Sequence, residues 1–321
     1  MQKKPVNLKK ILYWVAISIL SLVILVCGAF IVSKLVTDAQ DKQDYADLAS
    51  KKEESPTDST RPPIPTGTQP TEPSETTEPT VATEPSEPSE PEVMVPSETT
   101  PSEPVLSEPT TVPEPTEPSA TTEPTQPTEP KILSQFQALH AINKDMVGWI
   151  EIPGTEINYP VVQSPYEANF YLRKNFYKEK ATCGTIYVRE ACNVFAPSDN
   201  VTIYGHNMRN GTMFADLHLY EEKSFWWDNR YIFFDTLYEY HTYEIFAIFI
   251  STADLDVGFK YHIFDDARNQ QEYDEFVAKC KELSLYDTGI TPEYGEKLIT
   301  LSTCDKSIDD GRFVVVARRV V

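Results

Sequence analysis

The longest hydrophobic stretch of the chain lies near its N-terminus, where a run of 23 residues, ILYWVAISILSLVILVCGAFIVS, follows the basic segment MQKKPVNLKK. As a helix, such a run is long enough to cross a hydrocarbon core of about 30 Å. A secretory signal peptide has a shorter apolar region, of roughly 7 to 15 residues, and a small-residue cleavage site. The pattern therefore predicts an uncleaved transmembrane signal-anchor helix over residues 11–36, preceded by a cytoplasmic basic tail over residues 1–10.

The lysines of this basic tail determine the expected orientation of the anchor. Lys3, Lys4, Lys9 and Lys10 place the N-terminus inside the cell by the positive-inside rule. Everything after Val36 is then outside, so we expect a single-pass protein of the cell membrane whose folded part is extracellular.

A different pattern begins near residue 131 and continues to the last residue. Short runs rich in Val, Ile, Tyr and Phe, such as NVTIYGHNM and RFVVVARRV, alternate with Gly, Pro, Asn and Asp. This spacing predicts a mainly antiparallel barrel or sandwich, formed by one domain over residues 131–321. A helix is expected at its start, in SQFQALHAINKDMVGWIEI, which turns into a strand at Trp149.

One further helix interrupts the predicted strands, in the segment QQEYDEFVAKCKELS. Five of its residues fall on a single helical face and predict its buried side: Tyr273, Phe276, Val277, Cys280 and Leu283. Cys280 is therefore expected to be a core residue rather than a reactive one.

Residues 37–130 are expected to form an extracellular linker between the anchor and the domain. From about residue 56 this linker is rich in Pro, Glu and Thr, with 20 of the 26 prolines and no aromatic residue. Such a segment buries too little apolar surface to fold, and its prolines favour extended conformations. A passive, disordered spacer is the simplest interpretation, and a ligand for a proline-recognising partner or a glycosylated stalk are the alternatives.

The distribution of charge along the chain indicates which classes of partner it can bind. Residues 56–130 carry two thirds of the formal net charge of −21, and no basic patch or stripe stands out elsewhere. The electrostatic footprint of a nucleic-acid-binding protein is therefore missing, and we expect no nucleic-acid partner.

The cysteines and histidines do not have the spacing of a metal site. No pair of them shows the short separation that zinc sites use, so no metal is expected. Cys183 and Cys192 are nine residues apart and are candidates for a disulfide in an extracellular domain. A free thiol remains the alternative for each of them.

Cys304 differs from the other cysteines because it ends the predicted strand LITLSTC, on the same face as Ser302. Arg312 opens the next predicted strand, and if the two strands pair, its guanidinium returns to the same end of the sheet. A cysteine nucleophile also needs an acid or base, and His206, directly after the strand NVTIYG, is the best placed histidine. The alternative is a buried thiol, a structural histidine and a solvated arginine.

The remaining histidines are expected to be structural or exposed. These are His140, His218, His241 and His262.

Residues 140–321 resemble the sortases, the membrane-anchored cysteine transpeptidases of Gram-positive bacteria, and specifically their class B. The resemblance rests on DMVGWIEIPGTEINYPVVQS, NFYLRKNFY, GTIY, NVTIYGHNM, MFADLHLY, YEIFAIF, LITLSTC and GRFVVVARR, in the family's order. It implies a closed barrel of about eight strands with N-terminal helices, and the helix before the Cys strand is the one that distinguishes class B from class A.

The resemblance also implies roles for individual residues. Cys304 is implied to be the nucleophile, His206 the general acid and base, and Arg312 the cation that binds the oxyanion or the substrate. Ser302 looks like a substrate contact, and Leu172 in NFYL is similar to residues that line the groove for the sorting signal. A supporting acid has been assigned after the cysteine in this class, and three residues compete for it here: Asp305, Asp309 and Asp310.

The implied reaction is transpeptidation without a cofactor. The enzyme cleaves a C-terminal sorting motif of a secreted protein, holds the acyl group as a thioester on Cys304, and transfers it to an amine of a peptidoglycan precursor. Alternatives are a pilus-polymerising enzyme that uses a pilin lysine, a cysteine endopeptidase that hydrolyses its thioester, and a non-catalytic surface adhesin on a stalk. The long spacer and the continuation GTIYVREACN depart from the family's usual pattern.

Overall fold

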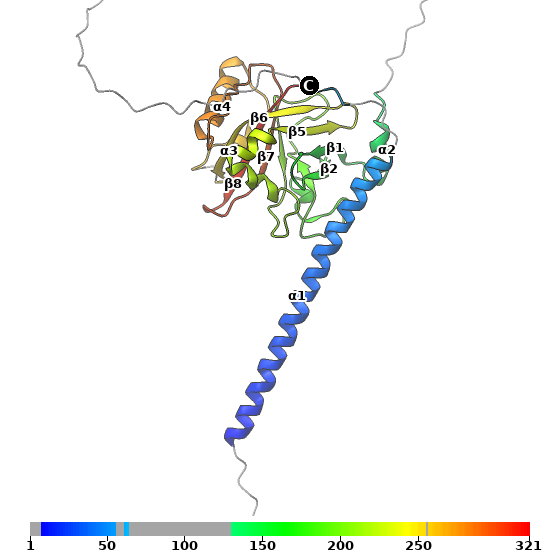
Figure 1. Cartoon of the computed structure of the whole chain (residues 1–321), viewed down its shortest axis with the longest axis vertical. Coiled ribbons are helices and arrows are strands. Elements are labelled where there is room, and N and C mark those ends of the chain that lie inside the picture. Colours follow the sequence, from blue (N-terminus) through cyan, green and yellow to red (C-terminus); the bar gives the residue numbers. More distant parts are fainter. Residues whose placement is uncertain (1–7, 56–60, 64–129, 255) are drawn as a thin grey trace, which may run out of the picture. The chain divides into compact units, whose positions relative to one another are not determined.

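The computed structural model of the chain describes residues 8–55, 61–63, 130–254 and 256–321. In this part of the chain eight strands close into a barrel with the order β1-β2-β3-β4-β7-β8-β6-β5 (Figure 1). The strands are β1 (Met146–Glu151), β2 (Asn158–Val162), β3 (Ile186–Val188), β4 (Asn200–Tyr204), β5 (Tyr231–Thr236), β6 (Thr242–Thr252), β7 (Leu298–Cys304) and β8 (Gly311–Arg319). The predicted closed barrel of about eight strands is therefore confirmed.

Helices connect and flank these strands. The α-helices are α1 (Leu8–Glu54), α2 (Ser134–Ile142), α3 (Lys223–Asp228) and α4 (Gln270–Leu283), and the 3-10 helices are η1 (Phe170–Arg173), η2 (Ala215–Glu221) and η3 (Tyr261–Ile263). The first strand of the barrel begins at Met146, three residues before the predicted start at Trp149. The apolar residues continue without a break from Met146 to Ile150, all buried, so the side-chain pattern does not mark where the strand begins.

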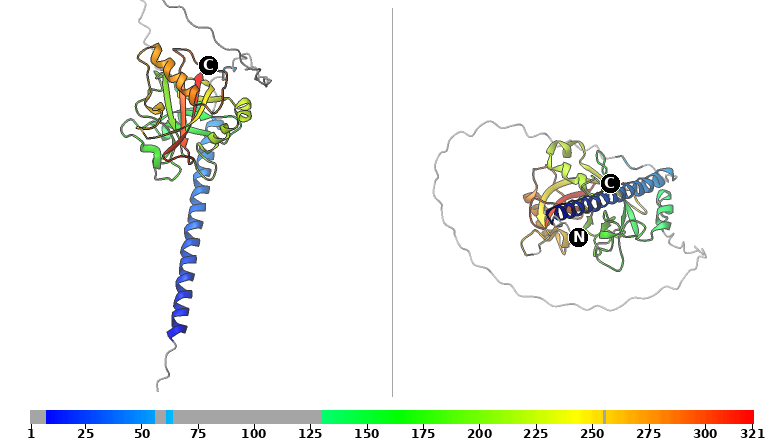
Figure 2. Two further views of the ribbon diagram at one scale, coloured as in Figure 1. Left: turned by 90° about the vertical axis from the view of Figure 1, so that its left-hand side faces the viewer. Right: turned by 90° about the horizontal axis from the view of Figure 1, so that it is seen from below.

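The predicted helix before the Cys strand is α4, which lies on the outside of the barrel (Figure 2). The side chain of Asn269 caps its N-terminus by accepting a hydrogen bond from the backbone N–H of Glu272 at 3.1 Å, a common way to satisfy a free helical donor. Four residues of the predicted apolar face are buried and Leu283 is partly buried against the core. Cys280 is fully buried, as expected from the helical pattern.

Two parallel pairings in the barrel decide where the strand ends meet. Strand β2 pairs in parallel with β3, and β4 pairs in parallel with β7, while the other neighbours are antiparallel. In the second parallel pair Tyr204 lies opposite Ser302. Because parallel strands present their carboxyl ends at one edge of a sheet, the residues that follow β4 and the last residue of β7 lie at the same edge.

Helix α1 consists of two different halves. From Leu12 to Val36 its large apolar side chains are exposed, and this half is long and apolar enough to cross a membrane. Further along, Tyr45 and Leu48 are buried, and the Tyr45 hydroxyl donates a hydrogen bond to the carbonyl of Gly184 at 2.6 Å. Residues 37–54, which the sequence pattern assigned to the linker, therefore continue the helix, and their apolar residues pack against the barrel.

Residues near both ends of the proline-rich segment also contact the barrel. The Arg61 guanidinium donates to the Asp235 carboxylate at 2.6 Å and to the His241 carbonyl at 3.1 Å. On the other side, the backbone N–H of Leu133 donates to the carbonyl of Leu237 at 2.8 Å. The predicted spacer itself lies outside the described residues, apart from the short stretch 61–63.

Candidate active site

Strand pairing brings the three predicted catalytic residues to one edge of the barrel. Cys304 is the last residue of β7, and Arg312, the second residue of β8, lies directly opposite it in the antiparallel pair. His206 follows β4 by two residues, and β4 runs parallel to β7. The Thr303 hydroxyl donates to the Gly205 carbonyl at 2.8 Å, which fastens the start of the His206 loop to the Cys strand.

These residues line one cavity of about 310 Å³. His206, Cys304 and Arg312 contribute to its wall, and so do Leu172 and Ser302. The structure therefore brings together all five residues that the sequence predicted for the site.

Burial separates Cys304 from the other cysteines of the barrel. Cys183, Cys192 and Cys280 are buried, whereas Cys304 is exposed. Burial raises the pKa of the Cys192 thiol to about 12, and it also raises the pKa of Cys183 and Cys280. Because the thiolate is the reactive form of cysteine, these three buried thiols are unreactive.

The disulfide considered between Cys183 and Cys192 is not formed, since both are free thiols with different surroundings. The Cys192 sulfur lies 3.3 Å from the Asp265 carboxylate and accepts from the backbone N–H of Thr202 at 3.4 Å. Cys183 instead donates to the carbonyl of Gly184, at 3.5 Å. Nine residues of separation permitted a bridge, but the path of the chain directs the two side chains to different neighbours.

The ring of His206 is half-buried and held by one hydrogen bond. Its Nε2 lies 2.8 Å from the carbonyl oxygen of Leu172. A carbonyl can only accept, so this bond assigns the proton to Nε2 and leaves Nδ1 as the basic nitrogen of the neutral ring. Burial lowers the pKa of His206, the Leu172 carbonyl partly offsets this effect, and the charge of Arg173 lowers the pKa further. His206 is therefore neutral at pH 7.

The guanidinium of Arg312 binds only backbone oxygens within the described part of the chain. It donates to the carbonyls of Asp310 at 3.1 Å and Gly311 at 2.8 Å, and it forms no ion pair with a described acidic side chain. These bonds orient the side chain while leaving its charge unneutralised. A cation held in this way is suited to stabilising a developing negative charge.

Hydroxyl groups form part of the cavity wall beside Cys304. Ser302 is buried, and its hydroxyl lies 2.8 Å from the hydroxyl of Tyr261 in η3. Tyr187 and Tyr204 add two further aromatic side chains to the wall. These tyrosines could not be recognised from the sequence, because they look like ordinary strand residues until the loops are placed.

Gly205 is required by packing rather than by its backbone conformation. Its φ is not in the positive range. A Cβ at this position would lie 2.5 Å from Cδ1 of Ile186 and 2.6 Å from the ring of Phe214. The glycine thus lets the chain pass close to these side chains immediately before His206.

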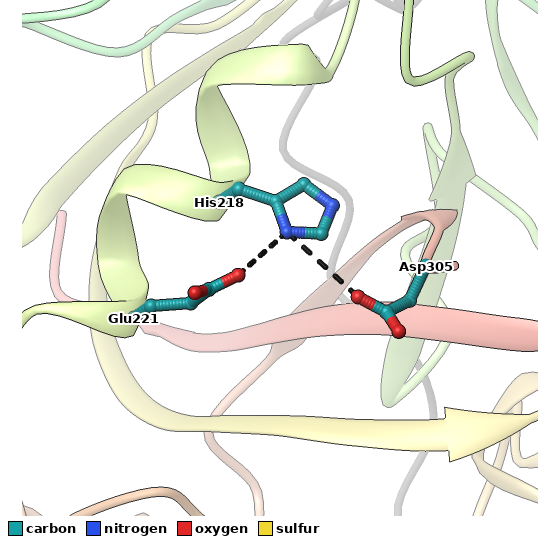
Figure 3. A group of neighbouring side chains, drawn as sticks. All are labelled: His218, Glu221 and Asp305. Carbon is teal, nitrogen blue, oxygen red and sulfur yellow. Dashed lines mark hydrogen bonds and ion pairs between the residues drawn. The ribbon is translucent and has the colours of Figure 1, made fainter. Parts of the chain in front are cut away.

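A second group of side chains surrounds His218 of η2 (Figure 3), and Nε2 of this histidine lies 3.4 Å from the backbone carbonyl oxygen of Cys304. The Nδ1 atom of His218 is 2.8 Å from a carboxylate oxygen of Glu221 and 3.9 Å from one of Asp305. The structure thus pairs Asp305 with His218, and Asp309 and Asp310 contribute only backbone carbonyls, to Thr252 and Arg312. His218, which the sequence predicted to be structural or exposed, is thus a partly buried residue with two acidic neighbours.

The same three side chains form a group that could hold a metal ion, because their ligand atoms lie within 4.8 Å of one another. Spacing along the chain did not reveal this group, since Asp305 is 84 residues or more from its two partners. Nδ1 of His218 already has Glu221 as a hydrogen-bond partner. This direct bond explains why the side chains lie close together.

Comparisons with known proteins agree with this geometry. The family model for the sortase domain matches residues 150–320. Sortase B of Listeria monocytogenes is 34% identical over 191 residues, covering 59% of this chain and 75% of the relative. A Bacillus anthracis protein described as similar to sortase B has a crystal structure with a TM-score of 0.54 and 36% identity, covering 61% of this chain and 86% of that chain. The sortase B–substrate complex of Staphylococcus aureus has a TM-score of 0.54 and 31% identity, covering 59% and 86%.

Proposed function

This chain belongs to the sortase family of cysteine transpeptidases, and from that premise we propose that Cys304, His206 and Arg312 transfer the acyl group of a sorting motif to an amine. The observation that carries the proposal is the cavity at the edge where β4 and β7 end and β8 begins. It combines the exposed thiol of the barrel, a neutral histidine and an arginine without a described acidic partner.

In the first half of the reaction, Cys304 attacks the backbone carbonyl carbon of the sorting motif. The Nδ1 atom of neutral His206 accepts the thiol proton, and the new C–S bond places negative charge on the carbonyl oxygen. The Arg312 guanidinium stabilises this oxyanion. When the C–N bond breaks, protonated His206 gives its proton to the leaving amine, and a thioester on Cys304 remains.

In the second half, an incoming amine attacks the thioester carbon and His206 accepts a proton from it. The C–S bond then breaks and the sulfur of Cys304 recovers its proton from His206. Transfer requires the amine to react faster than water, and enclosure in a cavity lined by Leu172 and aromatic side chains favours this outcome.

Leu172 and Ser302 are the proposed contacts to the sorting motif. Leu172 is 38% exposed and lines the cavity beside His206, so an apolar side chain of the motif can pack on it. Ser302 offers a hydroxyl that already pairs with Tyr261. The similarity of this chain to the sortase B–substrate complex of Staphylococcus aureus supports a substrate-binding site of the same family type.

The acceptor is proposed to be an amine of a peptidoglycan precursor at the outer face of the membrane. The exposed apolar half of α1 serves as the anchor, and Lys3, Lys4, Lys9 and Lys10 keep the N-terminus inside. Tyr45 follows Val36 by nine residues, a rise of about 14 Å along a helix. The docked end of α1 would therefore hold the barrel close to the bilayer.

The test uses the full chain in detergent micelles and a panel of sorting-type peptides. We expect intact mass measurement to show a peptide adduct on wild-type protein, discharged by a primary amine and absent from Cys304→Ala. Cys183→Ala is the matched control and is expected to keep the adduct, because that thiol is buried. A pilin peptide with a lysine tests the alternative acceptor.

If no peptide of a broad panel acylates the wild-type protein, the transpeptidase proposal is wrong and a stalked binding protein becomes the better account. If an adduct forms but water discharges it as fast in the presence of an amine as without one, the enzyme is an endopeptidase.

A further inference from the structure

The ring of His218 lies close to the backbone of Cys304 and to the residues that directly follow His206 and Arg312. It lies 3.0 Å from the side-chain amide of Asn207, which follows His206. It lies 3.4 Å from the backbone carbonyl of Cys304 itself. Its ring also packs on Phe313, which follows Arg312, with 4.5 Å between the ring centroids and 32° between the planes.

Asn207 provides the direct connection between two of the proposed catalytic residues. Its Nδ2 donates a hydrogen bond to the carbonyl oxygen of Cys304 at 3.0 Å. Since that carbonyl can only accept, the amide nitrogen of Asn207 must face it. The residue next to the proposed base is in this way bonded to the residue that carries the proposed nucleophile.

The second proton of the Asn207 amide determines the state of His218. The same Nδ2 faces Nε2 of His218 at 3.0 Å, so Nε2 accepts this proton and carries none of its own. The longer approach of Nε2 to the Cys304 carbonyl, at 3.4 Å, then joins two acceptors and is not a hydrogen bond. The proton then resides on Nδ1, which donates to the Glu221 carboxylate at 2.8 Å. The result is a continuous chain from Glu221 through His218 and Asn207 to the backbone of Cys304.

The other neighbours of His218 hold its ring in this orientation. Figure 3 shows the ring between Glu221 and Asp305. Asp305 is itself fixed, since its carboxylate accepts from the backbone N–H of Ser307 at 2.7 Å. Phe313 packs against the face of the ring, so the ring is restrained from three directions. The side chain of His218 is only about a quarter exposed.

We propose that His218 and Asn207 are positioning residues that fix the His206 loop relative to Cys304, an inference that rests on the function proposed above. The side chain of Asn207 carries the connection, and His218 holds the Asn207 amide in the orientation that makes it. Neither residue touches the reacting atoms. Both keep the proposed base, His206, in a fixed position relative to the proposed nucleophile, Cys304, although the two come from different strands.

The expected size of the effect follows from the sensitivity of reaction rates to geometry. A misplacement of about 1 Å can cost roughly 100-fold in rate. The hydrogen bond from the Thr303 hydroxyl to the Gly205 carbonyl and the one from the Phe214 N–H to the His206 carbonyl remain in either variant. We therefore expect loss of the side-chain connection to lower kcat by roughly 10-fold to 100-fold while leaving KM nearly unchanged.

The experiment measures kcat and KM for peptide cleavage with the full chain in micelles. The variants are His218→Ala, Asn207→Ala, the double variant and His218→Gln. The control is Leu219→Ala, an exposed residue of the same 3-10 helix. Thermal unfolding is recorded for each variant, and Asn207→Ala keeps the test valid if His218→Ala does not fold.

Three results together would support the inference. Each single alanine variant loses kcat with KM within about threefold of wild type, the pattern expected for a transition-state effect. The double variant is no slower than the worse single variant, because the two residues act through one connection. His218→Gln restores most of the rate, since its amide oxygen can accept the Asn207 proton.

Two results would overturn it. One is a kcat for His218→Ala that equals that of Leu219→Ala, and the other is a double variant in which the two losses multiply. If wild-type protein itself forms no thioester, the proposed function fails and the inference fails with it. A normal wild-type thioester with an unaffected His218→Ala contradicts the positioning role alone.

Discussion

The two sides of the strand end at Cys304 differ in how far their polar groups are already bonded. On the cavity side, no acidic side chain among the described residues pairs with Arg312, and no hydrogen bond to Nδ1 of His206 is found within the same part of the chain. One hydrogen bond orients the His206 ring and two orient the Arg312 guanidinium. On the opposite side, His218 is bonded to Glu221 and Asn207, and Asn207 in turn to the backbone of Cys304.

This difference indicates a division of labour. Groups that must bind a substrate or exchange a proton cannot be fully occupied within the protein, and they depend on others to hold them in place. The hydrogen-bonded network around His218 supplies that support. Because the network is already formed, no reorganisation energy is spent during the reaction, as electrostatic preorganisation requires. Substitutions that change one side at a time can test this division of labour.

The largest effect is expected on the cavity side, from removal of the Arg312 charge. Arg312→Ala should lower kcat/KM roughly 100-fold to 1,000-fold, the usual cost of losing an oxyanion donor. Arg312→Lys should recover part of this loss, because it keeps the charge but not the geometry of the guanidinium. The measurement is the rate of thioester formation by quenched intact mass.

A loss of less than about threefold in Arg312→Ala would contradict an oxyanion role. Arg173→Ala is a suitable control, since this arginine also carries a positive charge near His206 but donates to the carbonyl of Thr182.

The next effect is expected in the pH dependence of kcat/KM, through the protonation of His206. Burial lowers the pKa of His206 below its ordinary value of 6.5, so the neutral ring should persist below that pH. We expect the acid limb of kcat/KM to lie below pH 6.5, with a fall of about tenfold per pH unit once His206 is protonated. An acid limb centred above pH 6.5 would contradict the assignment of His206 as the base.

The lowered pKa of His206 also makes a prediction for folding stability. Just below pH 6.5 the unfolded chain binds a proton that the folded chain rejects, so stability is complete above that pH and declines as the pH falls. Burial lowers the pKa of His140, His241 and His262 in the same direction. Urea unfolding of His206→Gln should therefore show a smaller decline than wild type, but not its complete absence.

The smallest effect on activity is expected at Tyr45, in the docked half of α1. Its hydroxyl donates to the Gly184 carbonyl and lies 3.0 Å from the hydroxyl of Thr185, a residue of the cavity wall. Tyr45→Phe should lower the free energy of unfolding by about 1 kcal/mol, the net value of one such hydrogen bond. It should leave kcat nearly unchanged, because the bonds around His206 and Cys304 remain.

Urea unfolding and peptide cleavage of the same Tyr45→Phe preparation check both parts. A large loss of kcat at unchanged stability would mean that α1 contributes to the active site more directly than its contacts indicate. Tyr13→Phe, in the exposed apolar half, is the matched control and should change neither quantity.

Much of the fold could be predicted from the sequence because its signals are local. The apolar run of the anchor, the short strands and the apolar face of α4 each depend on a period of a few residues. The choice of Cys304, His206 and Arg312 as candidates followed from the motifs that surround them and from a resemblance to a family, and the comparison confirms that family. Even the pairing of Cys304 with Arg312 could be anticipated, since a short turn joins their strands.

The rest of the candidate site depended on contacts between distant segments. Nothing near His218 indicates that it meets Asp305, 87 residues later, and its surroundings look like those of an ordinary helix residue. The continuation of α1 beyond the anchor was missed because residues 37–54 are mostly polar, and only Tyr45 and Leu48 are buried there. The free thiols of Cys183 and Cys192 likewise reflect the path of the chain rather than their spacing.

By itself, the sequence determined the class of the fold, the presence of an apolar segment of membrane length and the three residues that are proposed to carry out the reaction. Only the tertiary structure decided that β4 and β7 run parallel, that α1 packs on the barrel and that His218 lies close to the backbone of Cys304. The physical reason is that hydrophobic periodicity acts over one turn or one strand, whereas pairing and docking are decided by which distant surfaces bury each other.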